Sequence, residues 1–138
     1  MATQVEIRSE DRDALVRLSY HPSDQHLGTL LVEVRTGGLN LDHEVFSSGG
    51  DGLPAFLAGL ATDWRGWEGT RSWHTIEHGL TVEATHHGNR ARLLLIVRPD
   101  PDSGWEQNDW EVRLPLLVAP GESLAHIATA ARTLFAPA

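Results

Sequence analysis

Two short segments with helical periodicity interrupt a chain whose apolar residues otherwise alternate with polar ones. Apolar residues at three- and four-residue spacing form one face over residues 53–64 and another over residues 124–134. Around these segments lie strand-length runs, such as 5–8, 30–35 and 91–98, which glycine, proline, aspartate or serine separates. The pattern predicts an α+β domain in which two helices pack on an antiparallel sheet of about seven or eight strands.

Local signals place several boundaries of these elements. Asp51 can cap the first helix through its side chain, and Pro54 fits the first helical turn, where its missing N–H is not needed. Pro115 interrupts the strand expected at 109–118 and therefore predicts an edge strand or a bulge. The polar stretch 99–108 is expected to form a mobile loop.

The length of the chain suits one globular domain, residues 1–138. Its two halves, 10–67 and 70–136, each show three strands followed by a helix, which suggests a β-β-β-α pseudo-repeat. Residue identities barely match between the halves, so the repeat is one of pattern only. If both helices cover one face of the sheet, the other face must be solvated, curved around a groove, or buried in a partner.

Composition excludes several classes of function. The chain has no cysteine, which removes disulfides, thiolate metal ligands and cysteine nucleophiles. Its formal net charge is −8, from 19 acidic and 11 basic residues, so nucleic-acid binding is disfavoured and a basic protein partner would be attracted. No signal peptide is recognised at the N-terminus, and no apolar run is long enough to span a membrane. We therefore expect a cytoplasmic protein without a membrane partner.

Motifs for catalysis are also missing from the sequence. The glycines at 49–52 precede a helix but fit neither the dinucleotide-binding nor the phosphate-loop spacing, and no serine lies in a nucleophile elbow. We predict no catalytic residues and no cofactor, and expect a binding protein rather than an enzyme.

The most unusual segment lies at residues 64–73, where three tryptophans and two arginines occur together. Tryptophan supplies a large contact area, and arginine stacks on it or holds a carboxylate. The segment suits a hot spot for a protein partner or a platform for a planar ligand, but the indoles also suit core anchors at a helix-strand corner. The candidate binding residues are Trp64, Arg65, Trp67, Arg71 and Trp73.

Histidines are frequent, but their spacing does not predict a metal site. His74 and His78 would share one face of a helix, yet the segment 71–77 is predicted to be a strand. On a strand the two imidazoles would stand about 13 Å apart, too far for one metal ion. His86 and His87 fall in a predicted hairpin turn, where adjacent side chains point apart.

The segment 49–57 and the motif W-R-G-W-x-G-T-R-x-W at 64–73 resemble those of an uncharacterised family from high-GC bacteria, described only as a domain of unknown function. The resemblance covers residues 10–135 and implies no catalytic residues. His78-Gly79 stands where the family has a tighter Gly-Asp turn. The chain is also loosely similar to small immunity proteins that neutralise bacterial toxins, in its size, acidity and expected fold.

Together these observations favour a non-enzymatic acidic binding protein that engages a protein partner, with an immunity-like role as one option. The alternative is a small-molecule-binding protein or enzyme with a groove lined by the segment 64–73. A homodimer formed through an exposed sheet face is a further option. The sequence leaves open the biochemical activity, the identity of the partner or ligand, the oligomeric state and the biological process.

Overall fold

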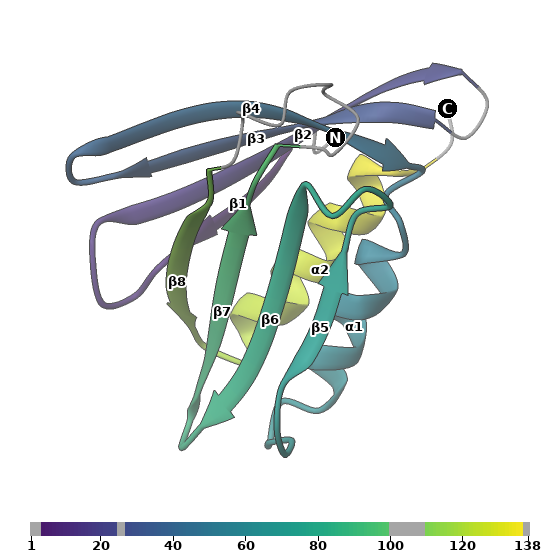
Figure 1. The fold of residues 1–138 in the computed structure, drawn as a ribbon. Coiled ribbons are helices and arrows are strands. Elements are labelled where there is room, and N and C mark those ends of the chain that lie inside the picture. Colours follow the sequence, from purple (N-terminus) through teal and green to yellow (C-terminus); the bar gives the residue numbers. More distant parts are fainter. Residues whose placement is uncertain (1–3, 25–26, 100–109, 137–138) are drawn as a thin grey trace.

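The computed structural model describes residues 4–24, 27–99 and 110–136. Within these residues four strands and a helix follow one another twice along the chain (Figure 1). In chain order the elements are β1 (Val5–Arg8), β2 (Ala14–Asp24), β3 (Leu27–Thr36), β4 (Leu39–Ser48), α1 (Leu53–Thr62), β5 (Arg71–His74), β6 (Leu80–His87), β7 (Arg90–Val97), β8 (Val112–Val118) and α2 (Glu122–Leu134). The predicted unit of three strands and a helix omitted β1 and β5, and the pseudo-repeat itself stays a prediction. The loop expected at 99–108 lies outside the described residues, apart from Pro99.

The described strands form two four-stranded antiparallel sheets, not the single sheet that the pattern predicted. The N-terminal sheet has the order β1-β2-β3-β4 and the C-terminal sheet the order β5-β6-β7-β8. Helix α1 separates β4 from β5, which interrupts the succession of hairpins and lets β5 begin a new sheet. In Figure 1 the N-terminal sheet lies across the top of the C-terminal sheet.

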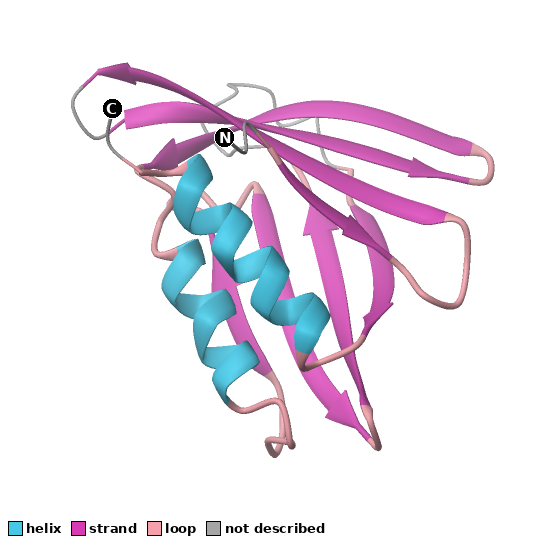
Figure 2. Cartoon of the chain, turned by 180° about the vertical axis from the view of Figure 1, so that it is seen from behind, coloured by secondary structure: helices cyan, strands magenta, loops and turns pink. Residues whose placement is uncertain are grey.

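The two helices lie side by side on one face of the C-terminal sheet, in front of it in the view of Figure 2, and below the N-terminal sheet. Their apolar faces are buried, as the spacing predicted, with Leu57 and Leu60 on α1 and Leu124 and Ala131 on α2. One hydrophobic cluster contains these residues together with alternate residues of both sheets. Because each fully buried aliphatic side chain contributes about 1.5–3 kcal/mol, this shared cluster holds the layers together. Neither of the two described helices is long and apolar enough to cross a membrane.

The two sheets meet where β1 ends and β8 passes. The Glu10 N–H donates to the Leu117 carbonyl at 2.8 Å, and the Leu117 N–H donates to the Ser9 hydroxyl at 3.0 Å. The Arg90 guanidinium lies 2.9 Å from the Glu10 carboxylate and adds an ion pair across the same junction. Among the described strands, β8 pairs within its sheet only with β7, which confirms the edge position that Pro115 predicted.

The connection from β4 to α1 differs from the predicted helix cap. Asp51 does not cap α1: Gly52 occupies the capping position, and no side chain of the described residues caps the helix. The backbone has positive φ at Asp51 (54°) and Gly52 (80°). This conformation directs the Asp51 carboxylate back to β4, and there the carboxylate accepts a hydrogen bond from the Ser47 hydroxyl at 2.9 Å. Pro54 lies in the first turn of α1, as predicted.

The same connection packs closely against the end of α2. Gly50 is buried and has a φ of 92°, and a Cβ atom at this position would lie 2.6 Å from Cγ of Phe135. The Phe135 ring also contacts Tyr20 of β2, with 4.9 Å between the ring centroids. Glycine is therefore required here both by its backbone conformation and by the close approach of an aromatic ring.

Candidate binding site

The segment 64–73 connects α1 to β5. Trp64 was predicted on the apolar face of the first helix, but α1 ends at Thr62 and Trp64 lies beyond it. Its side chain is 48% exposed, which is unusual for the largest apolar residue type. The earlier end of the helix thus moves Trp64 from the core to the surface.

The other two tryptophans of the segment are anchored to the fold. The Trp73 side chain is only 7% exposed, and its indole N–H donates to the Asp51 carbonyl at 2.9 Å. Trp67 is partly buried, and its indole N–H donates to the Ala84 carbonyl of β6 at 3.2 Å. Both indoles therefore serve as core anchors, which is one of the two roles that the sequence suggests for them.

The two arginines of the segment also differ. The Arg71 guanidinium lies 5.2 Å from the centre of the Trp67 ring and 2.8 Å from the Asp63 carboxylate, so it links the end of α1 to β5. The Arg65 guanidinium lies 5.1 Å from the centre of the exposed Trp64 ring. Within the described part of the chain, Arg65 has no ion pair, and its charge is available to a ligand.

His86 completes this region, although it is not among the site residues that the sequence predicts. Its Nε2 atom lies 3.0 Å from the Trp64 carbonyl, and because a carbonyl only accepts, Nε2 carries the proton. The His86 ring also meets the Trp67 ring edge-on, with centroids 5.1 Å apart. The period-2 pattern of β6 continued through His86 would have indicated that its side chain shares a face with Ala84.

A depression of about 370 Å³ lies beside these side chains. It extends from Trp64 to the β6–β7 turn and to Gly121 at the beginning of α2. We call its polar and aromatic lining the Trp64 patch, which consists of Trp64, Arg65, His86 and Asn89. None of the described residues that line the depression is acidic.

His74 and His78 lie together, contrary to the predicted separation. Strand β5 ends at His74, not near residue 77, because the chain turns back through a buried Thr75 whose hydroxyl accepts from the Leu80 N–H at 3.2 Å. The two imidazole rings stack with centroids 3.7 Å apart and planes inclined by 16°. Nearly parallel rings direct their in-plane lone pairs side by side instead of toward one point. The described residues contain no group of three or more histidines and carboxylates placed to hold a metal ion.

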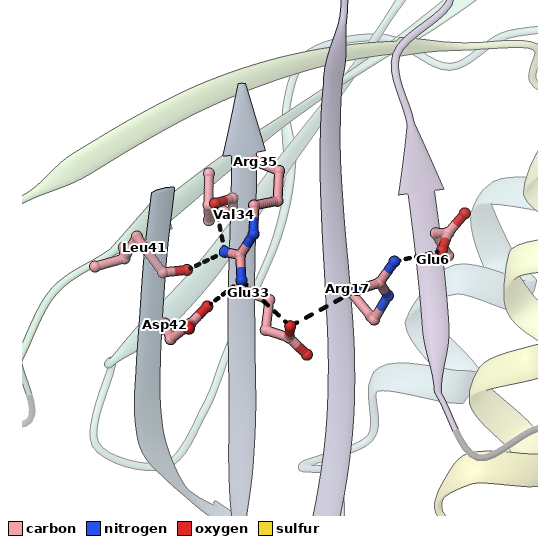
Figure 3. Close-up of polar contacts among 7 residues, drawn as sticks. All are labelled: Glu6, Arg17, Glu33, Val34, Arg35, Leu41 and Asp42. Atoms are coloured by element: carbon pink, nitrogen blue, oxygen red, sulfur yellow. Dashed lines mark hydrogen bonds and ion pairs between the residues drawn. The ribbon is translucent and has the colours of Figure 1, made fainter. Parts of the chain in front are cut away.

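The outer face of the N-terminal sheet carries a row of ion pairs across its four strands (Figure 3). Arg17 lies 3.2 Å from Glu6 and 3.7 Å from Glu33, and Arg35 lies 3.5 Å from Glu33 and 2.7 Å from Asp42. Of the arrangements considered for an uncovered sheet face, this alternation of charge fits a solvated surface best.

One carboxylate of this row has a shifted pKa. Partial burial of Glu6 raises its pKa, but hydrogen bonds and charge from Arg17 and Arg8 outweigh that effect and leave the pKa below the ordinary value of 4.5. The ionised form of Glu6 is therefore the one that the folded protein stabilises.

Over the residues that the structure describes, the fold and this site define a two-sheet α+β domain with an exposed tryptophan-arginine patch. The chain belongs to DUF6228, a family of unknown function, whose model matches residues 7–138. This match confirms the resemblance to a family described only as a domain of unknown function. No curated protein and no solved structure matches the chain. The bacterial origin and the likeness to immunity proteins stay predictions.

Proposed function

We propose that this protein is a non-catalytic binding protein that engages a protein partner through the Trp64 patch. The observation that carries the proposal is the exposure of Trp64 in a segment whose other two tryptophans are anchored by hydrogen bonds. The fold does not need Trp64 for its core, and the ring nevertheless lies in a defined position beside Arg65 and a depression.

The chemistry of the patch suits a hot spot. Tryptophan and arginine are among the residue types most enriched in the side chains that dominate binding energy. Such side chains lie in well-packed pockets and contact the corresponding side chains of the partner. Because Arg65 supplies a cation and the described lining lacks a carboxylate, the depression favours an aromatic or acidic side chain of the partner.

Long-range attraction adds a second preference. The net charge of −8 steers a partner with an overall basic surface toward the chain, while the patch selects the side chain that enters the depression. A cytoplasmic, immunity-like role is the specific form of this proposal, with a bacterial toxin as the partner. A toxin gene next to the gene for this chain would supply the partner to test first.

Crosslinking at a single position tests the proposal. A photoreactive phenylalanine derivative at position 64 should capture a partner in native cells, whereas the same derivative at position 76 should not. Ile76 is a matched control because it is 50% exposed and lies in the turn before β6, at the opposite end of that strand from His86. The captured partner should then bind the Ile76→Ala variant and should no longer bind the Trp64→Ala variant. Equal binding of the two variants would overturn the proposal.

A small-molecule ligand is the second candidate function. The volume of the depression supports this candidate, because it falls in the lower part of the range of about 300–1,000 Å³ found for ligand pockets. Planar aromatic carboxylates should shift the indole N–H resonance of Trp64 in a fragment screen by NMR and should not bind Trp64→Ala. A screen in which no fragment moves this resonance would remove the candidate.

A further inference from the structure

A second concave surface lies between β1 and α2, apart from the Trp64 patch. Two adjoining depressions of about 420 and 320 Å³ share Glu6, His126 and Ile127 in their linings. The larger one reaches Glu122 at the beginning of α2, and the smaller one reaches Thr133 near its end. Figure 3 shows α2, in yellow, beside the strand that carries Glu6. We call these two depressions together the β1–α2 groove.

The backbone of β1 presents hydrogen-bonding groups to this groove. The Ser9 N–H donates to the Ala14 carbonyl at 3.0 Å, and the register pairs Arg8 with Leu15. Since residues of an antiparallel strand direct their N–H and C=O groups to alternate sides, those of Glu6 and Arg8 point away from β2. The bond from the Glu10 N–H to β8 confirms this alternation.

Strand β8 does not cover these groups, because it ends at Val118 and the chain then turns into α2. Within residues 4–24, 27–99 and 110–136, no backbone group outside β1 and β2 forms a hydrogen bond with the N–H or C=O of Glu6 or Arg8. An edge strand with free groups beside a helix is the arrangement that accepts an added peptide strand.

The charges along the groove indicate which peptide would enter. Its described lining contains the carboxylates of Glu6, Glu10 and Glu122 against one arginine, Arg8. Glu6 and Glu10 have arginine partners, but Glu122 has none among the described residues. Together with the net charge of −8, this lining favours a cationic segment.

We propose that the β1–α2 groove binds an extended, basic segment of a partner protein, which adds to β1 as a further strand of the N-terminal sheet. Main-chain hydrogen bonds to Glu6 and Arg8 fix its register, and basic side chains on one face of the added strand approach Glu10 and Glu122. This inference is independent of the Trp64 patch, since the two surfaces have no described lining residue in common.

The probe for this proposal is a short capped peptide of alternating lysine and valine, and the readout is the set of backbone amide shifts in NMR spectra of the whole chain. The peptide should shift the amides of Glu6 and Arg8 first. Arg8→Pro removes an N–H that β2 does not use, and its ring occupies the place of the added strand, so binding should weaken at least about tenfold. Arg8→Ala is the matched control: it keeps the N–H, removes a repelling charge, and should bind at least as well as the original chain.

Peptide variants give a second measurement that does not depend on folding of the Arg8→Pro protein. N-methylation of the peptide's edge-facing amides should abolish binding, and replacing its lysines by glutamates should weaken binding at least about tenfold. Glu122→Gln should weaken binding of the lysine peptide by about threefold. The proposal is overturned if Arg8→Pro and Arg8→Ala bind alike, or if the shifts map away from β1. It is also overturned if the groove is already filled by a second copy of this chain, seen as a dimer that Arg8→Pro dissociates.

Discussion

Replacement of Gly50 by alanine tests the close packing between the β4–α1 connection and the end of α2. The φ of 92° costs an L-residue about 1–2 kcal/mol, because the left-handed region is unfavourable for any side chain. The new Cβ would lie 2.6–3.0 Å from three ring atoms of Phe135, and such overpacking costs a further 1–3 kcal/mol or so. The two effects together predict a loss of about 2–5 kcal/mol in the free energy of unfolding.

Gly52→Ala separates the two effects. Gly52 has a similar φ of 80°, but a Cβ there meets no atom of the described residues within 4 Å, so this variant should lose only about 1–2 kcal/mol. Urea unfolding followed by tryptophan fluorescence gives both values by linear extrapolation. In a Phe135→Ala background the difference between the two variants should vanish. If Gly50→Ala and Gly52→Ala are equally stable, or if their difference persists without the Phe135 ring, the packing argument is wrong.

Three further changes probe other contacts of the fold. Trp73→Phe removes the indole that donates to the Asp51 carbonyl and should lower the free energy of unfolding by about 1–3 kcal/mol; an unchanged urea midpoint would contradict this. Arg17→Met should raise the pKa of Glu6 in an NMR titration. Because the folded-state pKa of Glu6 is depressed, its contribution to stability is present above pH 4.5 and is lost as the pH falls through the folded-state pKa, so this variant should show a smaller loss on acidification. Ser9→Ala removes the hydroxyl that accepts the N–H from β8, and hydrogen exchange of that amide should accelerate about fivefold or more; unchanged protection would show that this bond does not secure the junction of the sheets.

The elements of the fold could be predicted from local patterns, but their assembly into sheets could not. The spacing of Leu57 and Leu60 identifies α1, because a helix that covers a core must repeat its apolar residues in this way. Alternation in a strand likewise shows which residues face inward, but it is the same whichever sheet the strand joins. The division into two sheets depends on β4 and β5 not pairing, which is a long-range property.

The candidate site was located by composition, while the roles within it depend on distant contacts. Trp73 is buried because its indole reaches the Asp51 carbonyl, and Trp67 is held by the Ala84 carbonyl of another strand. No local sequence pattern shows that these two tryptophans are anchored to the fold while Trp64 is exposed. The error at His74 and His78 has a local cause: the Leu80 N–H donates to the Thr75 hydroxyl, five residues away, and the turn that this bond closes ends β5 early.

The contacts of α2 with α1 and β1 have a consequence for synthesis of the chain. A helix encoded near the end of the sequence supplies apolar side chains that complete the core under strands encoded near its beginning. While the ribosome is still making the earlier segments, the inner face of the N-terminal sheet and one side of α1 have nothing to pack against. We therefore expect the core to close only after residues 122–134 have left the exit tunnel, and the apolar faces of the earlier segments to stay exposed until then.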